Sequence, residues 1–312
     1  MAGKLAFVYA GQGSQHAGMG RDLYEQYPSF RAVLDAAPVD FDLKTLCFEG
    51  PEETLAQTQY TQPCMVAFAA GVTALLRENG IEPDFAAGLS LGEYSALHAA
   101  GAFDAETAVA LAAYRGKAMT EAVTGLSCAM RAVLGLDRQP LQAACDAASD
   151  LGVCEIANYN CPSQLVIAGE TAAVEKASEL ALAAGAKRCV PLHVSGPFHT
   201  SLMRPVGDAL ARRFETMTFS PLRFPVVHNA TGLPMQEGET LAGLLEQQVQ
   251  RSVHFEDSIR WLAGQGVDTI VEIGPGKTLS GFIRKTVKGI KTYAVEDCAG
   301  LEAVLTALKG AE

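Results

Sequence analysis

Residues 85–100 read FAAGLSLGEYSALHAA and contain the only Gly-x-Ser-x-Gly pentapeptide of the chain. The apolar run Phe85–Leu89 predicts a buried strand, and Glu93–Ala100 predicts a helix. Glycines two residues to either side of Ser90 let the backbone turn sharply from strand to helix, which exposes the Ser90 hydroxyl beside the first free N–H groups of the helix. An ordinary Gly-rich turn would have the same sequence, but the flanking strand and helix favour Ser90 as a nucleophile.

Short apolar runs alternate with longer segments of helical period in the rest of the chain, which is typical of an α/β protein with parallel strands covered by helices. The expected strands are Leu5–Ala10, Phe85–Leu89, Phe224–His228 and Thr269–Ile273, and the expected helices are Pro63–Glu78, Ala105–Val123, Leu202–Phe214 and Ser258–Gln265. The fold class is therefore predicted to be α/β with a parallel sheet.

The middle of the chain has a different rhythm, with elements in the order β-α-β-β-α-β. The predicted strands are Ala129–Leu134, Val153–Asn158, Gln164–Ala168 and Arg188–Leu192, and the helices are Pro140–Ala148 and Ala172–Ala183. This order is typical of a ferredoxin-like domain. We therefore predict a large domain formed by residues 1–126 and 197–312, with a small ferredoxin-like domain, 127–196, inserted into it.

Composition excludes several classes of function. The chain has 312 residues, 49% of them apolar, and a net charge of −11, so a large core is expected and nucleic acid is not an expected partner. The 8 cysteines form no C-x-x-C pair, which disfavours a metal site and a disulfide framework. No apolar run approaches the roughly 20 residues that span a bilayer. We expect a cytoplasmic protein that does not bind membranes, and a monomer because no coiled-coil pattern is visible.

A serine nucleophile needs a base, and the chain has 6 histidines. His199 follows the constrained turn Ser195-Gly196-Pro197-Phe198 at the start of a predicted helix, so it is the candidate base. His16 is ambiguous because it lies in a Gly-rich loop. The remaining histidines are interpreted as packed or solvated; they are His98, His193, His228 and His254.

Two further segments could complete a site. The loop Gly11-Gln12-Gly13 directly follows the first predicted strand, so its N–H groups would lie at the carboxyl end of the sheet, although a plain tight turn would have the same sequence. Arg115 interrupts a strongly apolar helix. From the residues alone a surface position is favoured, but near Ser90 its planar guanidinium could hold a substrate carboxylate bidentately.

Taken together, these segments resemble malonyl-CoA:acyl carrier protein transacylases along essentially the whole chain. The matching segments are residues 11–15 (GQGSQ), 60–63 (YTQP), 88–97 (GLSLGEYSAL), 115–119 (RGKAM), 158–162 (NYNCP), 198–203 (FHTSLM), 246–249 (EQQV) and 274–279 (GPGKTL). The resemblance implies an α/β-hydrolase-like large domain and an acyltransferase without a cofactor. It also implies that Ser90 takes the malonyl group from malonyl-CoA and passes it to the phosphopantetheine thiol of acyl carrier protein, in fatty acid biosynthesis.

The resemblance also assigns roles to single residues. His199 would be the base, oriented by the backbone carbonyl of Gln248, and the N–H groups of Gln12 and Leu91 would hold the oxyanion. Arg115 matches the carboxylate clamp, which implies a preference for malonyl over acetyl. The chain departs from the common pattern without losing a proposed catalytic group; the departures are Leu89 for His, Ala10 for Pro, Arg131 for a small residue and Ser252 for Pro.

Acyl carrier proteins are strongly acidic, so a partner with a charge of −11 needs a local basic patch. The candidates are Arg284 and Lys285, with Lys288 and Lys291 nearby, and the pair Lys187 and Arg188.

A discrete acyltransferase of a polyketide synthase would use the same residues, and the sequence does not separate it from a fatty acid enzyme. A thioesterase of the α/β-hydrolase type is disfavoured because further strands follow His199, and an inactive carrier-binding scaffold because Ser90, His199 and Arg115 are all present.

Overall fold

The computed structural model describes residues 3–192 and 194–309, so His193 lies outside the described residues. The chain divides into two compact units. Unit 1 comprises Met1–Lys117, Phe219–Val227 and Arg260–Glu312, and unit 2 comprises Ala118–Thr218 and His228–Ile259. Each unit has its own sheet, which confirms a mixed α/β protein with a parallel sheet and a second sheet.

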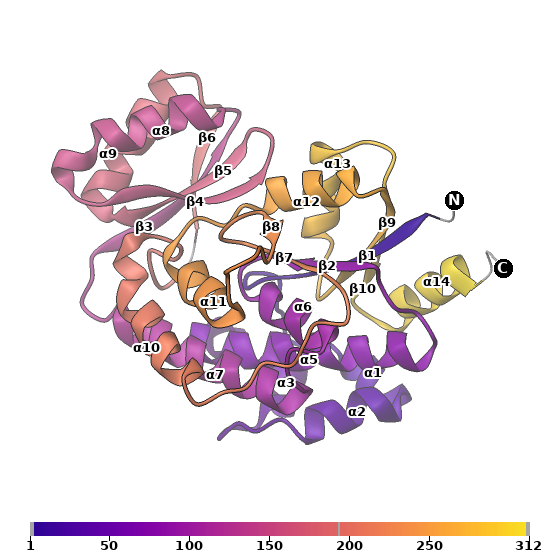
Figure 1. Ribbon diagram of the computed structural model, residues 1–312. Helices are drawn as coiled ribbons and strands as arrows, with labels where there is room; N and C mark the ends of the chain where they lie inside the picture. The colour runs from indigo at the N-terminus through magenta and orange to yellow at the C-terminus, as the bar shows by residue number, and fades with distance from the viewer. Residues whose placement is uncertain (1–2, 193, 310–312) are drawn as a thin grey trace. The chain divides into compact units, whose positions relative to one another are not determined.

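The sheet of unit 1 is parallel, with its strands in the order β10-β9-β1-β2-β7. These strands are β1 (Lys4–Tyr9), β2 (Phe85–Gly88), β7 (Val226–His228), β9 (Val267–Ile273) and β10 (Lys291–Val295). All four residues of β2 are buried, as expected for a parallel strand covered on both faces. Figure 1 shows α5 (Thr58–Glu78) and α6 (Gly92–Ala100) on one side of this sheet and α13 (Thr278–Thr286) on the other.

Several short helices complete unit 1. They are α1 (Arg21–Gln26), α2 (Pro28–Asp35), α3 (Leu43–Glu49), α4 (Glu52–Leu55) and α14 (Cys298–Lys309), while α7 (Ala105–Ala122) and α12 (Phe255–Gly264) contribute to both units. The predicted start of α5 at Pro63 is wrong, because the N–H groups of Tyr60 and Thr61 bond to the Gln57 carbonyl and begin the helix one turn earlier. Similarly, α12 begins at Phe255 rather than Ser258.

Unit 2 contains an antiparallel sheet with the strand order β4-β5-β3-β6, and its elements follow the predicted order β-α-β-β-α-β. They are β3 (Cys128–Leu134), α8 (Arg138–Ala147), a 3₁₀ turn (Ser149–Leu151), β4 (Cys154–Cys161), β5 (Gln164–Glu170), α9 (Thr171–Ala183) and β6 (Arg188–Pro191). Val133, Leu141, Ile167 and Val174 belong to the core that α8 and α9 form against this sheet.

Unit 2 extends beyond the predicted insertion at 127–196. It also holds a 3₁₀ turn (Ser201–Met203), α10 (Arg204–Phe214), β8 (Leu233–Pro234) and α11 (Leu241–Gln250). Backbone bonds explain the difference, because Val253 donates to Ala157 and accepts from Tyr159, both in β4. The division into a large domain (1–126 and 197–312) and a small domain (127–196) stays a prediction. Over the described ranges, no helix is both long and apolar enough to cross a bilayer.

Candidate active site

Ser90 lies in the turn between β2, which ends at Gly88, and α6, which begins at Gly92. Its φ of 52° is in the left-handed region that residues with a side chain rarely adopt. A Cβ on Gly88 would lie 2.0 Å from the carbonyl carbon of Gly92, and one on Gly92 would lie 2.1 Å from the Tyr9 carbonyl oxygen. Both positions therefore require glycine, and the predicted strand, turn and helix around Ser90 are confirmed.

Two backbone amides lie close to this turn. The N–H groups of Leu91 and Gln12 form no hydrogen bond within residues 3–192 and 194–309, whereas the next amide along α6, that of Gly92, donates to Leu89. A Cβ on Gly11 would lie only 2.5 Å from the Leu89 carbonyl oxygen, so the loop after β1 packs directly on the turn that carries Ser90. The two amides are thus available for an anion at the same sheet edge.

The Gln12 side chain holds this loop in place, because its Nε2 donates to Thr58 Oγ1 at 3.0 Å. Thr58 is the first residue of α5, and it is buried. The Gly-rich loop is therefore anchored to a long core helix rather than left as a free surface turn.

Arg115 is fully buried, and its Nη2 donates to Ser90 Oγ at 3.3 Å. Its guanidinium also lies 5.4 Å from the centre of the Tyr94 ring. The interpretation of Arg115 as a surface residue is therefore wrong. Its neighbour Gly116 lets α7 approach α5, because a Cβ there would lie 2.8 Å from the Thr58 carbonyl oxygen. Periodicity within α7 alone could not show which helix covers the Arg115 face.

Burial lowers the pKa of Arg115, and the neighbouring Tyr94 and Glu93 partly offset this effect. A buried guanidinium is expensive to desolvate, and a carboxylate next to it would recover part of that free energy. The Ser90 hydroxyl therefore lies beside a buried cation that suits an acyl group carrying a free acid.

His199, in unit 2, also has a left-handed backbone, with a φ of 63°. Its Nδ1 lies 2.9 Å from the backbone oxygen of Gln248, and both residues are buried. Since a carbonyl can only accept, Nδ1 carries the proton and Nε2 is left as the basic nitrogen. Gln248 lies in the last turn of α11, where carbonyls have no partner within the helix, so its oxygen can orient the imidazole without a carboxylate.

The other described histidines make local contacts. His98 Nδ1 lies 3.1 Å from the Phe103 carbonyl oxygen, and burial lowers the pKa of this imidazole. His16 Nδ1 lies near the Ala17 oxygen, and His254 Nδ1 lies 3.0 Å from an Asp257 carboxylate oxygen. His228 is fully buried. These observations support the interpretation of His98, His228 and His254 as packed or solvated residues, and they give His16, which the sequence left ambiguous, only a local backbone contact.

Among the predicted basic residues, Lys187 and Arg188 are exposed at the start of β6 in unit 2. Arg284 and Lys285 are exposed in the last turn of α13 in unit 1. Within residues 3–192 and 194–309, no group of three or more His, Cys, Asp or Glu side chains is arranged to hold a metal ion.

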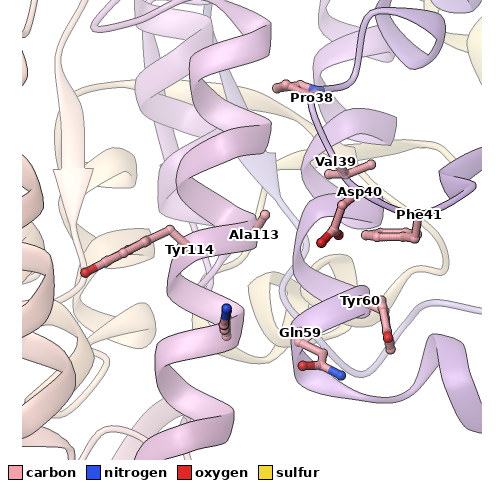
Figure 2. Close-up of a pocket in the computed structure, with 9 residues that line it drawn as sticks. Pro38, Val39, Asp40, Phe41, Gln59, Tyr60, Ala113 and Tyr114 are labelled. Atoms are coloured by element: carbon pink, nitrogen blue, oxygen red, sulfur yellow. The ribbon is translucent and has the colours of Figure 1, made fainter.

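Unit 1 also has a cavity of about 380 Å³ beside α7 (Figure 2). Phe41 and Tyr60 pack edge to face in its wall, with ring centres 5.0 Å apart. From α7, the cavity is lined by Ala113, Tyr114 and Lys117. Helical spacing puts Arg115 on the opposite face of α7, and neither Arg115 nor Ser90 is among the residues that line this cavity.

Comparison with known proteins defines the class: residues 6–304 match the acyl transferase domain family. The malonyl CoA-acyl carrier protein transacylase of Bacillus subtilis is 43% identical over 309 residues, 98% of each chain. The chain belongs to the family of malonyl CoA-acyl carrier protein transacylases.

Solved structures agree with this assignment. The crystal structure of MCAT from Streptococcus pneumoniae has 47% identity and a TM-score of 0.93, and the match covers 97% of this chain and 100% of that one. A chain from the complex of a type II polyketide acyl-carrier protein with its malonyl-transacylase has 39% identity and a TM-score of 0.94, with 98% and 99% coverage.

Tyr94 is a contact of the site that was not predicted from the sequence. It lies four residues after Ser90, on the first turn of α6, and its ring packs under the Arg115 guanidinium. The signal is its position within the matched segment GLSLGEYSAL, which places Tyr94 on the first turn of the helix that follows Ser90.

Proposed function

We propose that this protein transfers the malonyl group from malonyl-CoA to the phosphopantetheine thiol of acyl carrier protein, in fatty acid biosynthesis. The observation that carries the proposal is the buried Arg115 guanidinium 3.3 Å from the Ser90 hydroxyl. A nucleophile with a desolvated cation beside it suits a thioester whose acyl group ends in a second, free carboxylate. The names of the relatives support the same donor and acceptor.

In the first half-reaction, Ser90 Oγ attacks the thioester carbonyl while His199 Nε2 accepts the hydroxyl proton. The tetrahedral oxyanion accepts hydrogen bonds from the N–H groups of Gln12 and Leu91, and each such donor contributes about 3 kcal/mol. The C–S bond then breaks, and CoA leaves with the proton that His199 returns. This leaves malonyl-Ser90 and a neutral imidazole.

The second half-reaction repeats these steps with a different nucleophile. His199 takes the proton of the carrier thiol, the thiolate attacks the malonyl-Ser90 ester, and Ser90 leaves with the proton. Both steps use only side chains and amides of this chain with its two substrates. In both, Gln248 holds the imidazole in the same tautomer.

We also propose the finer fold description. The parallel sheet of unit 1 is α/β-hydrolase-like, and residues 127–196 are ferredoxin-like. The exposed residues that would dock the acidic carrier are Lys187, Arg188, Arg284 and Lys285.

A second candidate function keeps the chemistry and changes the acceptor. The neighbour solved with a type II polyketide acyl-carrier protein favours a polyketide carrier as an alternative. Parallel transfer assays with carriers from the two pathways separate the candidates by kcat/KM.

Intact-protein mass spectrometry after mixing with malonyl-CoA tests the main proposal. We expect a malonyl-sized adduct on the wild-type protein, little adduct from acetyl-CoA, and none on Ser90→Ala. Release of CoA without an adduct would indicate hydrolysis by water and contradict the proposal. If no CoA is released and no adduct forms, only a binding role remains.

A further inference from the structure

One carboxylate outside the proposed catalytic set contacts the His199 loop. Glu155, the second residue of β4, accepts a hydrogen bond from the Ser201 backbone N–H at 2.9 Å and another from the Ser201 hydroxyl at 2.5 Å. Ser201 is two residues after His199 and begins the 3₁₀ turn that leads into α10. Glu155 thus binds the chain directly beyond the imidazole.

The same strand also binds the segment that follows Gln248. Ser252 Oγ donates to the Ile156 carbonyl at 2.6 Å, and the Val253 N–H donates to the Ala157 carbonyl at 2.8 Å. Ser252 stands where the resembling family commonly has proline, which has no hydroxyl to donate. This bond therefore distinguishes the present chain from that pattern.

Consecutive residues of β4 thus hold both partners of the His199–Gln248 hydrogen bond, one through the side chain of Glu155 and the other through the strand backbone. Such a restraint is needed because His199 has a left-handed backbone, which persists only where surrounding contacts hold it. A charged acceptor is also needed, because Glu155, Ser201 and Ser252 line a cavity of about 740 Å³ where water competes for the Ser201 donors.

We infer that Glu155 is a positioning residue for acyl transfer, acting through Ser201 to keep His199 Nδ1 on the Gln248 carbonyl. The inference rests on the proposed function. The carboxylate takes no part in bond making. Its effect is to keep Nε2 in the orientation in which it accepts a proton.

Rapid-quench measurement of malonyl-Ser90 formation between pH 5.5 and 8.5 tests this role. Glu155→Ala is expected to lower kcat for acylation about 10- to 100-fold, the loss typical of a displaced catalytic group, with KM for malonyl-CoA nearly unchanged. The apparent pKa of the acylation step should also fall, because a loosened Nδ1–carbonyl bond stabilises the imidazolium less. Glu155→Gln keeps one acceptor oxygen and should lose less.

Ser201→Ala tests the contact from the other side, and its effect should not add fully to that of Glu155→Ala in the double variant. Glu179→Gln is the matched control, since the Glu179 side chain is exposed on the outer face of α9 in the same unit and pairs at the surface with Lys176. If Glu155→Ala does not fold, Glu155→Gln and Ser201→Ala decide the question.

Wild-type kcat and an unchanged pH profile in the Glu155 and Ser201 variants would overturn the inference while leaving the proposed function intact. An equal loss in Glu179→Gln would also overturn it. Failure of the wild-type protein to form malonyl-Ser90 would instead refute the proposed function, and the positioning role with it.

Discussion

Replacement of Arg115 by glutamine should remove the preference for malonyl-CoA. Arg115 is fully buried and lies within hydrogen-bond distance of the Ser90 hydroxyl, so a substrate carboxylate paired with it is also desolvated. Removing one partner of such a pair costs about 2 to 5 kcal/mol. With about 1.4 kcal/mol for each factor of ten, a loss of about 3 kcal/mol lowers kcat/KM for malonyl-CoA about 150-fold.

Acetyl-CoA should respond in the opposite sense. Its acyl group offers no carboxylate to the guanidinium, so binding of acetyl-CoA does not recover the free energy that the buried charge of Arg115 costs. A neutral glutamine removes this cost. We therefore expect acetylation of Ser90 in Arg115→Gln to be unchanged or faster. Arg115→Lys retains the charge but loses the planar fork, and it should keep only part of the malonyl preference.

Initial rates of Ser90 adduct formation, followed by mass spectrometry with each thioester, measure the malonyl-to-acetyl ratio directly. Thermal unfolding of the variants checks that Arg115→Gln folds. If the two rates fall by the same factor, Arg115 supports Ser90 or the fold and does not select the substrate. An unchanged ratio would refute the clamp.

Three further perturbations test other parts of the structure. Gly88→Ala puts a Cβ 2.0 Å from the Gly92 carbonyl carbon, so denaturant unfolding should show a loss of about 3 kcal/mol or more; an unchanged midpoint would contradict the close approach. Burial alone would raise the pKa of Asp257, but bonds from His254 and Arg138 outweigh it and lower the pKa to about 2. Because this folded pKa is below the unfolded one, the stabilisation is present above about pH 4 and lost towards pH 2. Asp257→Asn should therefore be less stable than the wild type by on the order of 1 kcal/mol at pH 6 only. A difference in unfolding free energy between the two proteins that persists at pH 2 would argue against this. Arg284→Glu with Lys285→Glu should slow transfer to the carrier about tenfold at low salt while malonyl-Ser90 formation stays unchanged; equal transfer rates would exclude this surface from docking.

The sequence predicted the parts of the site that depend on local backbone geometry. Glycines at positions 88 and 92 are required by contacts within a few residues and with one neighbouring strand, so their spacing together with the flanking strand and helix identifies the turn around Ser90. The order of elements in residues 128–191 was also predictable, because apolar segments of strand length and of helix length follow one another closely there.

Features that depend on distant packing were not predictable in the same way. Arg115 is fully buried with its guanidinium over the Tyr94 ring of α6, and no periodicity within α7 reports that. The short helices between residues 21 and 55 have only one or two turns each, so their formation depends on packing against the rest of the unit. The Glu155–Ser201 contact joins residues 46 positions apart, and the sequence has no local signal for it.

The left-handed backbone at Ser90 and His199 limits how this protein could be made more thermostable. Within residues 3–192 and 194–309, three residues other than glycine have such a φ, and the third, Ser163, lies in the tight turn between β4 and β5. Stabilisation strategies commonly place glycine where the backbone is left-handed, because glycine adopts that region without strain. At Ser163 such a change should be harmless or beneficial. At Ser90 and His199 it would remove the reactive side chain, so the conformational strain at these two positions has to be kept. Stabilising substitutions therefore have to be made elsewhere in the chain.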